Sequence, residues 1–342
     1  MASADQLKAL VRSHITRDDG QFYSVAMQVA AHEAKVGHGK LAEELRDLID
    51  AAKSRVVPAE SGKLVPLARP RGELVNLLHV SYPKNRLSDM VLDASLVGQI
   101  QRIMEEQRLN ARIREHGLLP RRKLLLVGPP GTGKTMTASV LAGELGIPLF
   151  LVRLDALITK FMGETASKLR QIFDAISEVR GVYFFDEFDA IGSQRGLAHD
   201  VGEIRRVLNS FLQMIEQDHS HSIIVAATNH PEILDYALFR RFDDVLEYHL
   251  PTSEQAGELI RSRLGDFAPK PLPLKSLVNM TTGLSYAEIR RALDESIKEV
   301  VMRGENRVSS EILKKALQER KQLSERLKQN YKPLSHAANK AR

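Results

Sequence analysis

The stretch Gly128-Pro129-Pro130-Gly131-Thr132-Gly133-Lys134-Thr135 decides the fold of this chain. It matches the pattern G-x-x-x-x-G-K-[ST], in which backbone N–H groups wrap the phosphates of a nucleotide. In such a loop the lysine reaches the β- and γ-phosphates, and the last hydroxyl is a ligand of Mg²⁺. The stretch, together with the following Met136, therefore predicts a site for ATP and Mg²⁺, with Lys134 on the phosphates and Thr135 on the metal.

The residues on either side of this loop support the prediction. The preceding Leu124–Val127 is an unbroken apolar run, which is typical of a strand buried on both faces of a sheet. The following Met136–Leu145 reads as a helix, and its N-terminus would point at the phosphates. A glycine-rich turn that binds nothing would have to fall between a strand and a helix by chance.

Strand and helix patterns then alternate along the chain, which predicts a parallel sheet covered by helices on both faces. A helix is expected over about Asp93–Glu115 and another over about Glu164–Val179. After the first strand, four more strands are expected at Pro148–Arg153, Gly181–Phe185, Ser222–Thr228 and Val245–Leu250. The predicted fold class is an α/β P-loop nucleotide-hydrolase domain.

The segments outside the sheet predict further domains. In residues 1–54, apolar side chains recur at helical spacing, which predicts a small helical recognition domain. In residues 55–86, Pro and Gly interrupt this spacing, which predicts a linker with a short strand at Glu73–Val80. The sheet domain occupies residues 87–251 and a small helical lid residues 252–318. Helices at Glu258–Leu264, Ser285–Val301 and Ser309–Leu327 form the lid, and a basic tail covers residues 319–342.

Composition excludes several classes of protein. The chain has no cysteine, which rules out disulfides, thiol nucleophiles and thiolate metal sites. No apolar run approaches the roughly 18 residues of a membrane span, so a cytoplasmic protein without membrane contact is expected. Between Lys314 and Arg342 the chain has 9 basic and 2 acidic residues against a net charge of +6 overall. The basic character therefore belongs to the tail, which is either a solvated end or a nucleic-acid-binding arm.

Polar residues at the ends of two strands complete the predicted site. Asp186 and Glu187 follow an apolar strand, and ligands lie at the carboxyl ends of strands in open α/β sheets. Asp186 is expected to hold Mg²⁺ and Glu187 to polarise the attacking water. Asn229 ends the next strand, where a neutral amide can orient that water or contact the γ-phosphate. Each of these signals alone is also compatible with an ordinary polar turn.

In this order the motifs resemble those of the AAA ATPases over about Ser88–Gln318. Gly128–Thr135 is similar to their Walker A motif, Val182–Glu187 to Walker B, Asn229 to sensor 1 and Thr228–Asp243 to the second region of homology. The resemblance implies that Arg240 and Arg241 are arginine fingers, which reach the nucleotide of the neighbouring subunit. Because no Pro-Gly separates them, this region is similar to that of katanin- and spastin-like members.

The same resemblance implies a ring, typically of six identical subunits, that pulls or remodels a protein substrate. The pore loop would then consist of Lys160, Phe161, Met162 and Gly163. Its aromatic side chain and its thioether can contact many substrate side chains without sequence preference. Gly283–Ile289 is similar to a Gly-Leu-Ser-Gly-Ala-Asp signature at the start of a lid helix, with Tyr286 in place of the second Gly. Asp89–Val91 occupies the place where family members hold adenine, without their usual Gly pair.

Two other functions fit the sequence. A DNA-associated ATPase would use the basic tail as its arm, and a nucleotide-gated scaffold would assemble with a partner while turning over little. No H-E-x-x-H or G-x-S-x-G motif is present, so proteolysis would require a separate peptidase. The helical unit of residues 1–54 also resembles that of stand-alone bacterial AAA proteins that act beside a subtilisin-like protease, and we expect it to bind the partner.

Overall fold

The computed structural model describes residues 25–30, 32, 38–40, 42–43, 70, 72, 74–154, 165–188, 200–233 and 236–330. The chain divides into two compact units, Met1–Leu67 and Ala68–Arg342. In the first unit residues 25–30 are helical, and Val29 and Ala30 are buried. The remaining helices expected between residues 1 and 54 lie outside the described residues, so this domain stays a prediction.

The second unit is built on a sheet of six strands in the order β1-β3-β4-β5-β2-β6. Every neighbouring pair is parallel except β1 and β3 at one edge. The strands are β1 (Leu78–Ser81), β2 (Lys123–Val127), β3 (Leu149–Val152), β4 (Val182–Phe185), β5 (Ile223–Thr228) and β6 (Asp244–Glu247). The predicted α/β fold with a parallel nucleotide-binding sheet is confirmed.

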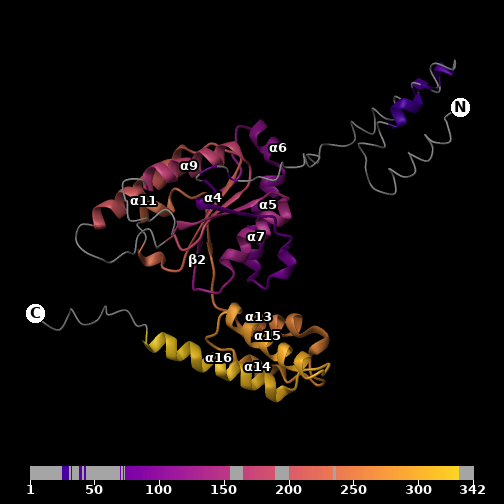
Figure 1. Ribbon diagram of the computed structural model, residues 1–342, viewed down its shortest axis with the longest axis vertical. Coiled ribbons are helices and arrows are strands. Elements are labelled where there is room, and N and C mark those ends of the chain that lie inside the picture. The colour runs from indigo at the N-terminus through magenta and orange to yellow at the C-terminus, as the bar shows by residue number, and fades with distance from the viewer. Residues whose placement is uncertain are drawn as a thin grey trace, which may run out of the picture. The chain divides into compact units, whose positions relative to one another are not determined.

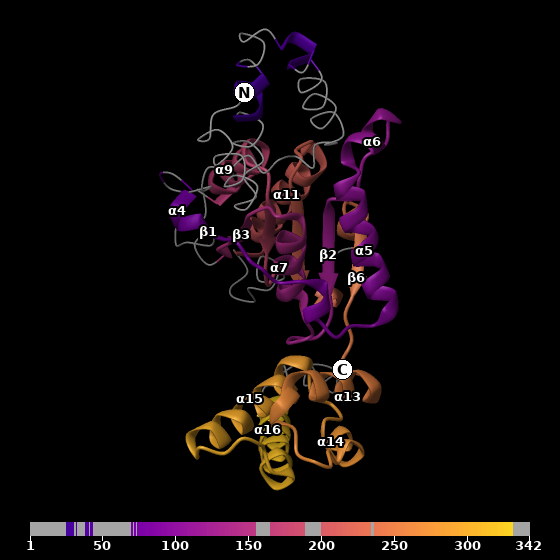
Figure 2. The same cartoon turned by 90° about the vertical axis from the view of Figure 1, so that its right-hand side faces the viewer.

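The apolar runs form central strands because both faces of the sheet are covered. Along β2, Leu125 and Val127 pack into the core on one face, while Leu124 and Leu126 pack into the core on the other. Strand β4 alternates in the same way, so a polar side chain at any of these positions would be buried. The helices α9 (Thr165–Glu178) and α11 (Asp200–Gln217) cover one face (Figures 1 and 2). The helices α5 (Ala94–Arg108) and α7 (Lys134–Leu145) cover the other.

The lid has a core of its own, made of apolar residues from four helices. These are α13 (Ser253–Leu264), α14 (Leu274–Met280), α15 (Tyr286–Met302) and α16 (Ser310–Asn330). Capping boxes formed by Thr252 with Gln255 and by Ser285 with Glu288 fix where α13 and α15 begin. The start of α15 is therefore defined by local sequence, and this start forms part of the site described below.

Several boundaries differ from the sequence prediction. The helix expected over Asp93–Glu115 is broken at Leu109 into α5 and α6 (Asn110–Glu115), and the last strand ends at Glu247 rather than Leu250. The short strand expected within the linker is β1, which joins the sheet and follows α4 (Leu74–Leu77). Further short elements are η1 (Leu87–Asp89), η3 (Pro231–Ile233), α12 (Tyr236–Phe239) and η4 (Gly265–Phe267). The last lid helix continues to Asn330, through the start of the predicted tail.

A buried ion pair joins the start of β2 to the turn before β5. The Arg122 guanidinium donates to the Asp218 carboxylate and backbone carbonyl, and only 5% and 2% of the two side chains are exposed. Ser220 also donates to the Asp218 carboxylate at 3.1 Å. Because water is excluded, removal of one partner leaves an uncompensated charge in the interior.

Asp218→Ala should therefore lower the free energy of unfolding by about 3–5 kcal/mol, measured by urea denaturation. Glu319→Ala is the control, because Glu319 and its partner Lys315 are 65% and 77% exposed and lie 4.0 Å apart. That change should alter stability by less than about 0.5 kcal/mol. Equal effects of the two substitutions would show that the Arg122–Asp218 pair does not stabilise the sheet.

Candidate functional site

The loop between β2 and α7 has the geometry of a phosphate cradle because its glycines have no side chains. Gly128 has a φ of 144°, and a Cβ atom there would lie 2.2 Å from the carbonyl oxygen of Tyr248. Gly131 has a φ of 75°, and its Cβ would lie 2.7 Å from Ser285 Oγ at the start of the lid helix. Both positions require glycine for conformation and for space. The loop is thus held between the end of β6 and the lid.

The first turn of α7 is anchored from two sides. Lys134 is buried, and its ammonium donates to the carbonyl oxygens of Gly128 at 2.7 Å and Pro129 at 2.8 Å. Thr137 shares a hydrogen bond of 2.6 Å with the hydroxyl of Tyr248. Burial raises the pKa of Tyr248, so this phenol stays protonated. These contacts hold Lys134 and the N-terminus of α7 beside the loop, where anions bind favourably.

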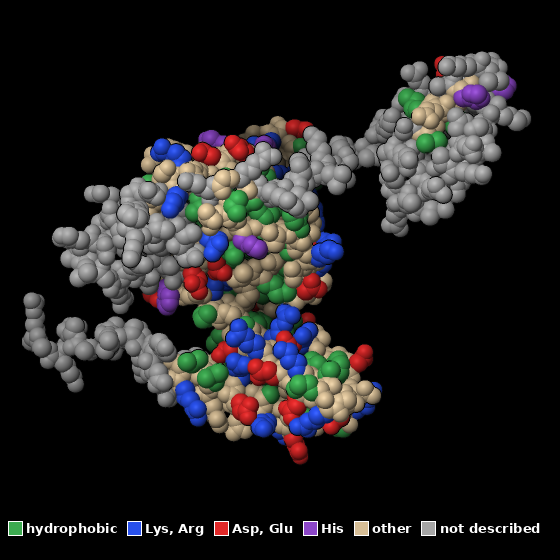
Figure 3. Space-filling model, in the orientation of Figure 1, with side chains coloured by type: hydrophobic (Ala, Val, Ile, Leu, Met, Phe, Trp, Pro, Cys, Tyr) green, Lys and Arg blue, Asp and Glu red, His purple; other side chains and the backbone are tan. Residues whose placement is uncertain are grey.

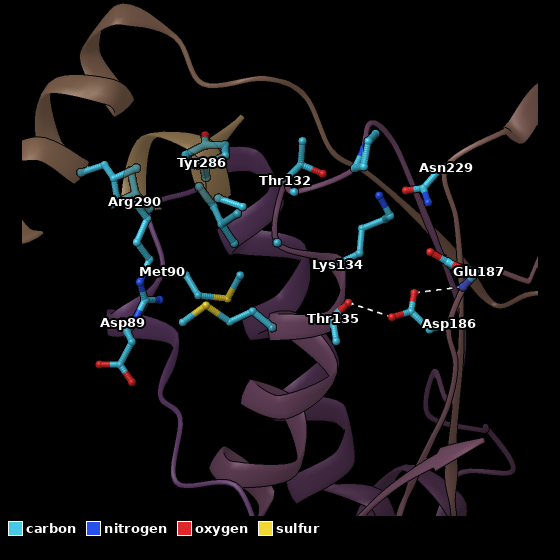
Figure 4. Close-up of a pocket in the computed structure, with 18 residues that line it drawn as sticks. Asp89, Met90, Thr132, Lys134, Thr135, Asp186, Glu187, Asn229, Tyr286 and Arg290 are labelled. Carbon is cyan, nitrogen blue, oxygen red and sulfur yellow. Dashed lines mark hydrogen bonds between the residues drawn. The ribbon is translucent and has the colours of Figure 1, made fainter. Parts of the chain in front are cut away.

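Asp186 and Glu187 form the turn that follows β4. The Thr135 hydroxyl donates to Asp186 Oδ2 at 3.0 Å, which brings the two predicted metal ligands together. Glu187 has a φ of 49°, a left-handed conformation that costs a non-glycine residue roughly 1–3 kcal/mol. The strain is maintained by Phe188, which is fully buried and donates from its backbone to Ala227 at 2.8 Å. The turn thus holds the exposed Glu187 beside Asp186 (Figure 4).

A cavity of about 380 Å³ lies over the loop, within the range of small-molecule sites. The predicted site residues that line it are Pro130, Gly131, Thr132, Gly133, Lys134, Thr135, Met136, Asp186, Glu187 and Asn229. Figure 4 shows Asp186, Glu187 and Asn229 on the side of the sheet, facing Lys134 and Thr135. The structure therefore brings together residues that lie up to a hundred positions apart in sequence.

The opposite end of the cavity is formed by the segment that the resemblance associates with adenine and by residues of the lid. Asp89–Leu92 lines it, as do Leu259, Tyr286, Ala287 and Arg290 of the lid. The backbone N–H of Ala287 donates to the carbonyl oxygen of Gly131 at 3.0 Å, which fastens the lid helix to the loop. The lid signature was visible in the sequence at Gly283–Ile289. Arg290 has a weaker signal, namely its position one helical turn after Tyr286.

Arg240 and Arg241 lie outside this cavity. They follow α12 and precede β6, and Asp243 pairs with the backbone of Lys123 at the start of β2. Because β2 and β6 are parallel, these arginines are at the opposite end of the sheet from the loop. The Arg241 guanidinium forms an ion pair of 2.9 Å with Glu216 of α11, and the two side chains are 30% and 52% exposed.

The pore-loop residues Lys160, Phe161, Met162 and Gly163 lie outside the described residues. Within the described ranges, no three His, Asp or Glu side chains gather as a metal cluster of their own. The helices described by the structure include none with both the length and the apolar character needed to cross a membrane.

Comparisons with known proteins point to a family of ATPases. Residues 124–250 match the model of the ATPase family associated with various cellular activities (AAA). An uncharacterised AAA family ATPase, y4kL, of Sinorhizobium fredii is 34% identical over 321 residues, which cover 93% of this chain and 96% of that protein. The ATP-dependent zinc metalloprotease FtsH 3 of Sphaerobacter thermophilus is 32% identical, and the match covers 72% of this chain and 52% of that protein.

A third relative is a putative 26S proteasome regulatory subunit homolog of Methanothermobacter thermautotrophicus. It is 32% identical over 205 residues, which cover 58% of this chain and 55% of that protein. This chain thus spans about half the length of both the metalloprotease and the proteasome homolog, but nearly all of the Sinorhizobium protein.

Proposed function

We infer that this chain, which belongs to the AAA family of ATPases, works as a ring of six identical subunits. The ring would remodel or unfold a protein substrate. The chain is an ATP hydrolase by this membership. The energy of hydrolysis would move the substrate through a central pore lined by the loop at residues 160–163.

The ring is inferred from the positions of the loop and Arg241 at opposite ends of the sheet. The loop follows the carboxyl end of β2, whereas Arg241 precedes the amino end of its parallel neighbour β6. An arginine in that place lies at the far end of the sheet from the site of its own subunit. It would contact a triphosphate only across an interface, and head-to-tail interfaces of this kind close into rings.

The residues in the cavity support an in-line attack of water on the terminal phosphate. Lys134 and the loop N–H groups would bind the phosphates, and Glu187 would accept a proton from the attacking water. Asn229 lies at the end of β5 and would orient that water without adding charge. These roles suit a reaction in which catalysis consists mainly of positioning and electrostatic stabilisation.

The Thr135 hydroxyl and the Asp186 carboxylate fit a magnesium ion. Both are oxygen donors, they meet at 3.0 Å, and Mg²⁺ is commonly bound by one or two such groups together with substrate phosphates. When bound, the ion supplies positive charge to the phosphate oxygens. Asp186 also accepts from the backbone N–H of Glu187 at 3.0 Å, so the same carboxylate orients the proposed base.

Protein rather than nucleic acid is the proposed substrate. Two of the relatives are by name a protease and a proteasome subunit homolog. On the face of the lid drawn in Figure 3, basic and acidic side chains are mixed rather than separated into one basic patch. In α16, Lys315 and Arg320 form ion pairs with Glu319 and Glu295. This pairing favours a solvated helix over a nucleic-acid arm.

Residues 1–54 are proposed to recognise a partner protein, which could be a separate protease. The chain itself carries no protease motif. ATP hydrolysis by this chain would accordingly drive unfolding of the substrate, and any peptide cleavage would occur in the partner.

Phe161→Ala should leave basal ATP hydrolysis within about twofold of the parent, because the family resemblance assigns residue 161 to the pore loop and not to phosphate binding. The same change should end unfolding of the substrate. The substrate would first be captured with a Glu187→Gln variant in ATP and then fused to a fluorescent protein whose unfolding abolishes emission. Phe161→Tyr keeps an aromatic ring and should retain unfolding. Unchanged unfolding by Phe161→Ala would place the substrate contact elsewhere.

A further inference from the structure

The nucleotide cavity has two chemically different ends. At one end lie the loop N–H groups, Lys134, Asp186 and Glu187, which suit phosphates and their metal ion. At the other end Met90 faces the lid residues Tyr286 and Arg290 across the cavity (Figure 4), and Leu92 also lines the cavity. The phosphate end fixes the orientation of a nucleotide, so its base must enter the second end.

One wall of the second end is apolar and rests on the loop. A Cβ atom at Gly133 would lie 3.1 Å from the terminal methyl carbon of Met90 and 3.9 Å from a methyl carbon of Leu92. The Met90 sulfur also accepts a contact of 3.9 Å from the Thr137 hydroxyl. A thioether and a branched aliphatic chain present a polarisable surface to a flat aromatic ring.

The other wall comes from the lid, and hydrogen bonds hold it in a fixed position beside the loop. The bond from Ala287 N to Gly131 O fixes the start of α15, and the Tyr286 hydroxyl donates to Gln255 Oε1 at 2.9 Å. The same oxygen accepts from the backbone N–H of Thr252 at 2.9 Å, so the phenol is tied to the cap of α13. Burial raises the pKa of Tyr286 to about 12, which keeps the phenol neutral.

Arg290 follows Tyr286 by four positions and therefore lies on the same face of α15. Its side chain descends from the helix toward Met90 and Asp89 (Figure 4). It is half exposed and has a long contact of 3.9 Å with Asp294, a weak interaction that leaves its guanidinium plane available to a base. Tyrosine rings and arginine guanidinium planes are the side chains on which bases stack.

We propose that Tyr286 and Arg290 form the surface on which the base of the bound nucleotide stacks, opposite Met90. This assignment rests on the proposed function, since it deepens the same ATP site. It gives Tyr286 a role that the glycine of the related signature could not perform. Stacking stabilises any bound base. Tyr286 and Arg290 would therefore raise the affinity for the nucleoside part of a ligand and leave the affinity for its phosphates unchanged.

The test compares the dissociation constants of Mg-ADP and Mg-pyrophosphate by calorimetry, because the two share their phosphates and differ in the nucleoside. Tyr286→Ala should weaken ADP binding about 5- to 150-fold, the loss typical of one stacked base. Pyrophosphate binding should stay within about twofold, and Tyr286→Phe, which keeps the ring, should bind ADP within about threefold of the parent. Arg290→Ala should weaken ADP selectively, whereas Arg291→Ala should not, because Arg291 is exposed and outside the cavity.

Equal losses for ADP and pyrophosphate in Tyr286→Ala would overturn the proposal, because they would show that Tyr286 only shapes the loop. Unchanged ADP binding would overturn it as well. Failure of the nucleotide site itself would appear differently, as a parent protein that binds neither ligand.

Discussion

A Glu187→Gln variant should bind ATP as the parent does and hydrolyse it about 10²–10⁴ times more slowly. A glutamine side chain has nearly the same shape as glutamate but cannot accept the proton of the attacking water. The strained φ of 49° at this residue supports the assignment, since such a conformation persists only where neighbours impose it. The buried Phe188 and its bond to Ala227 impose it here.

The measurement is steady-state phosphate release, with ATP binding followed in parallel by calorimetry. Glu232→Gln is the matched control, because Glu232 is an exposed glutamate that follows the neighbouring strand β5 and lies outside the cavity. It should hydrolyse at the parental rate. Because ATP stays bound, the Glu187→Gln protein should also elute as a stable ring in size-exclusion chromatography. Hydrolysis by Glu187→Gln at the rate of the parent would mean that another group is the base.

Arg241→Ala should reduce ATP turnover by about 10³–10⁵, the effect typical of an arginine finger. In the isolated subunit this guanidinium is paired with Glu216, but the pair is partly exposed. Exposed ion pairs contribute only about 0.2–1 kcal/mol, so little is lost when Arg241 turns to a triphosphate on a neighbour. The same assay applied to Arg240→Ala would show which of the two arginines makes the contact.

Mixing two inactive variants tests whether the contact crosses an interface. Arg241→Ala subunits keep an intact site, and Lys134→Ala subunits keep the finger. In a random one-to-one mixture, about a quarter of all sites would combine an intact loop with a neighbour's Arg241, so turnover should recover to about that fraction. Each variant alone should stay inactive, and Arg102→Ala, which removes an exposed arginine, should behave like the parent.

No recovery in mixed rings would argue against a finger supplied by the neighbour. Brisk hydrolysis by a dilute and demonstrably monomeric preparation would contradict both the finger and the ring. Arg241 would then lie at the far end of β6 from the loop for a reason other than contact with a neighbour's nucleotide.

Much of the site could be predicted from short stretches because their chemistry is local. The loop at residues 128–135 demands positive φ at its glycines, which few other residues adopt. Asp186 and Glu187 stand out because two acids directly follow four buried apolar residues. The outer part of the sheet was harder to predict. The four residues of β1 form a strand only because β3 offers an unpaired edge, and this pairing spans about seventy positions.

The sequence by itself determined the phosphate loop, the acidic pair after β4, the parallel α/β sheet and the lid helices, since each depends on the periodicity or backbone preference of neighbouring residues. Tertiary structure alone decided that Leu259 and Arg290 of the lid join Asp89–Leu92 and the loop in one cavity, and that Arg241 lies outside it. These facts depend on which surfaces meet when the lid packs on the loop and the strands align. Contacts between distant segments arise from packing of the whole chain, and no single stretch contains them.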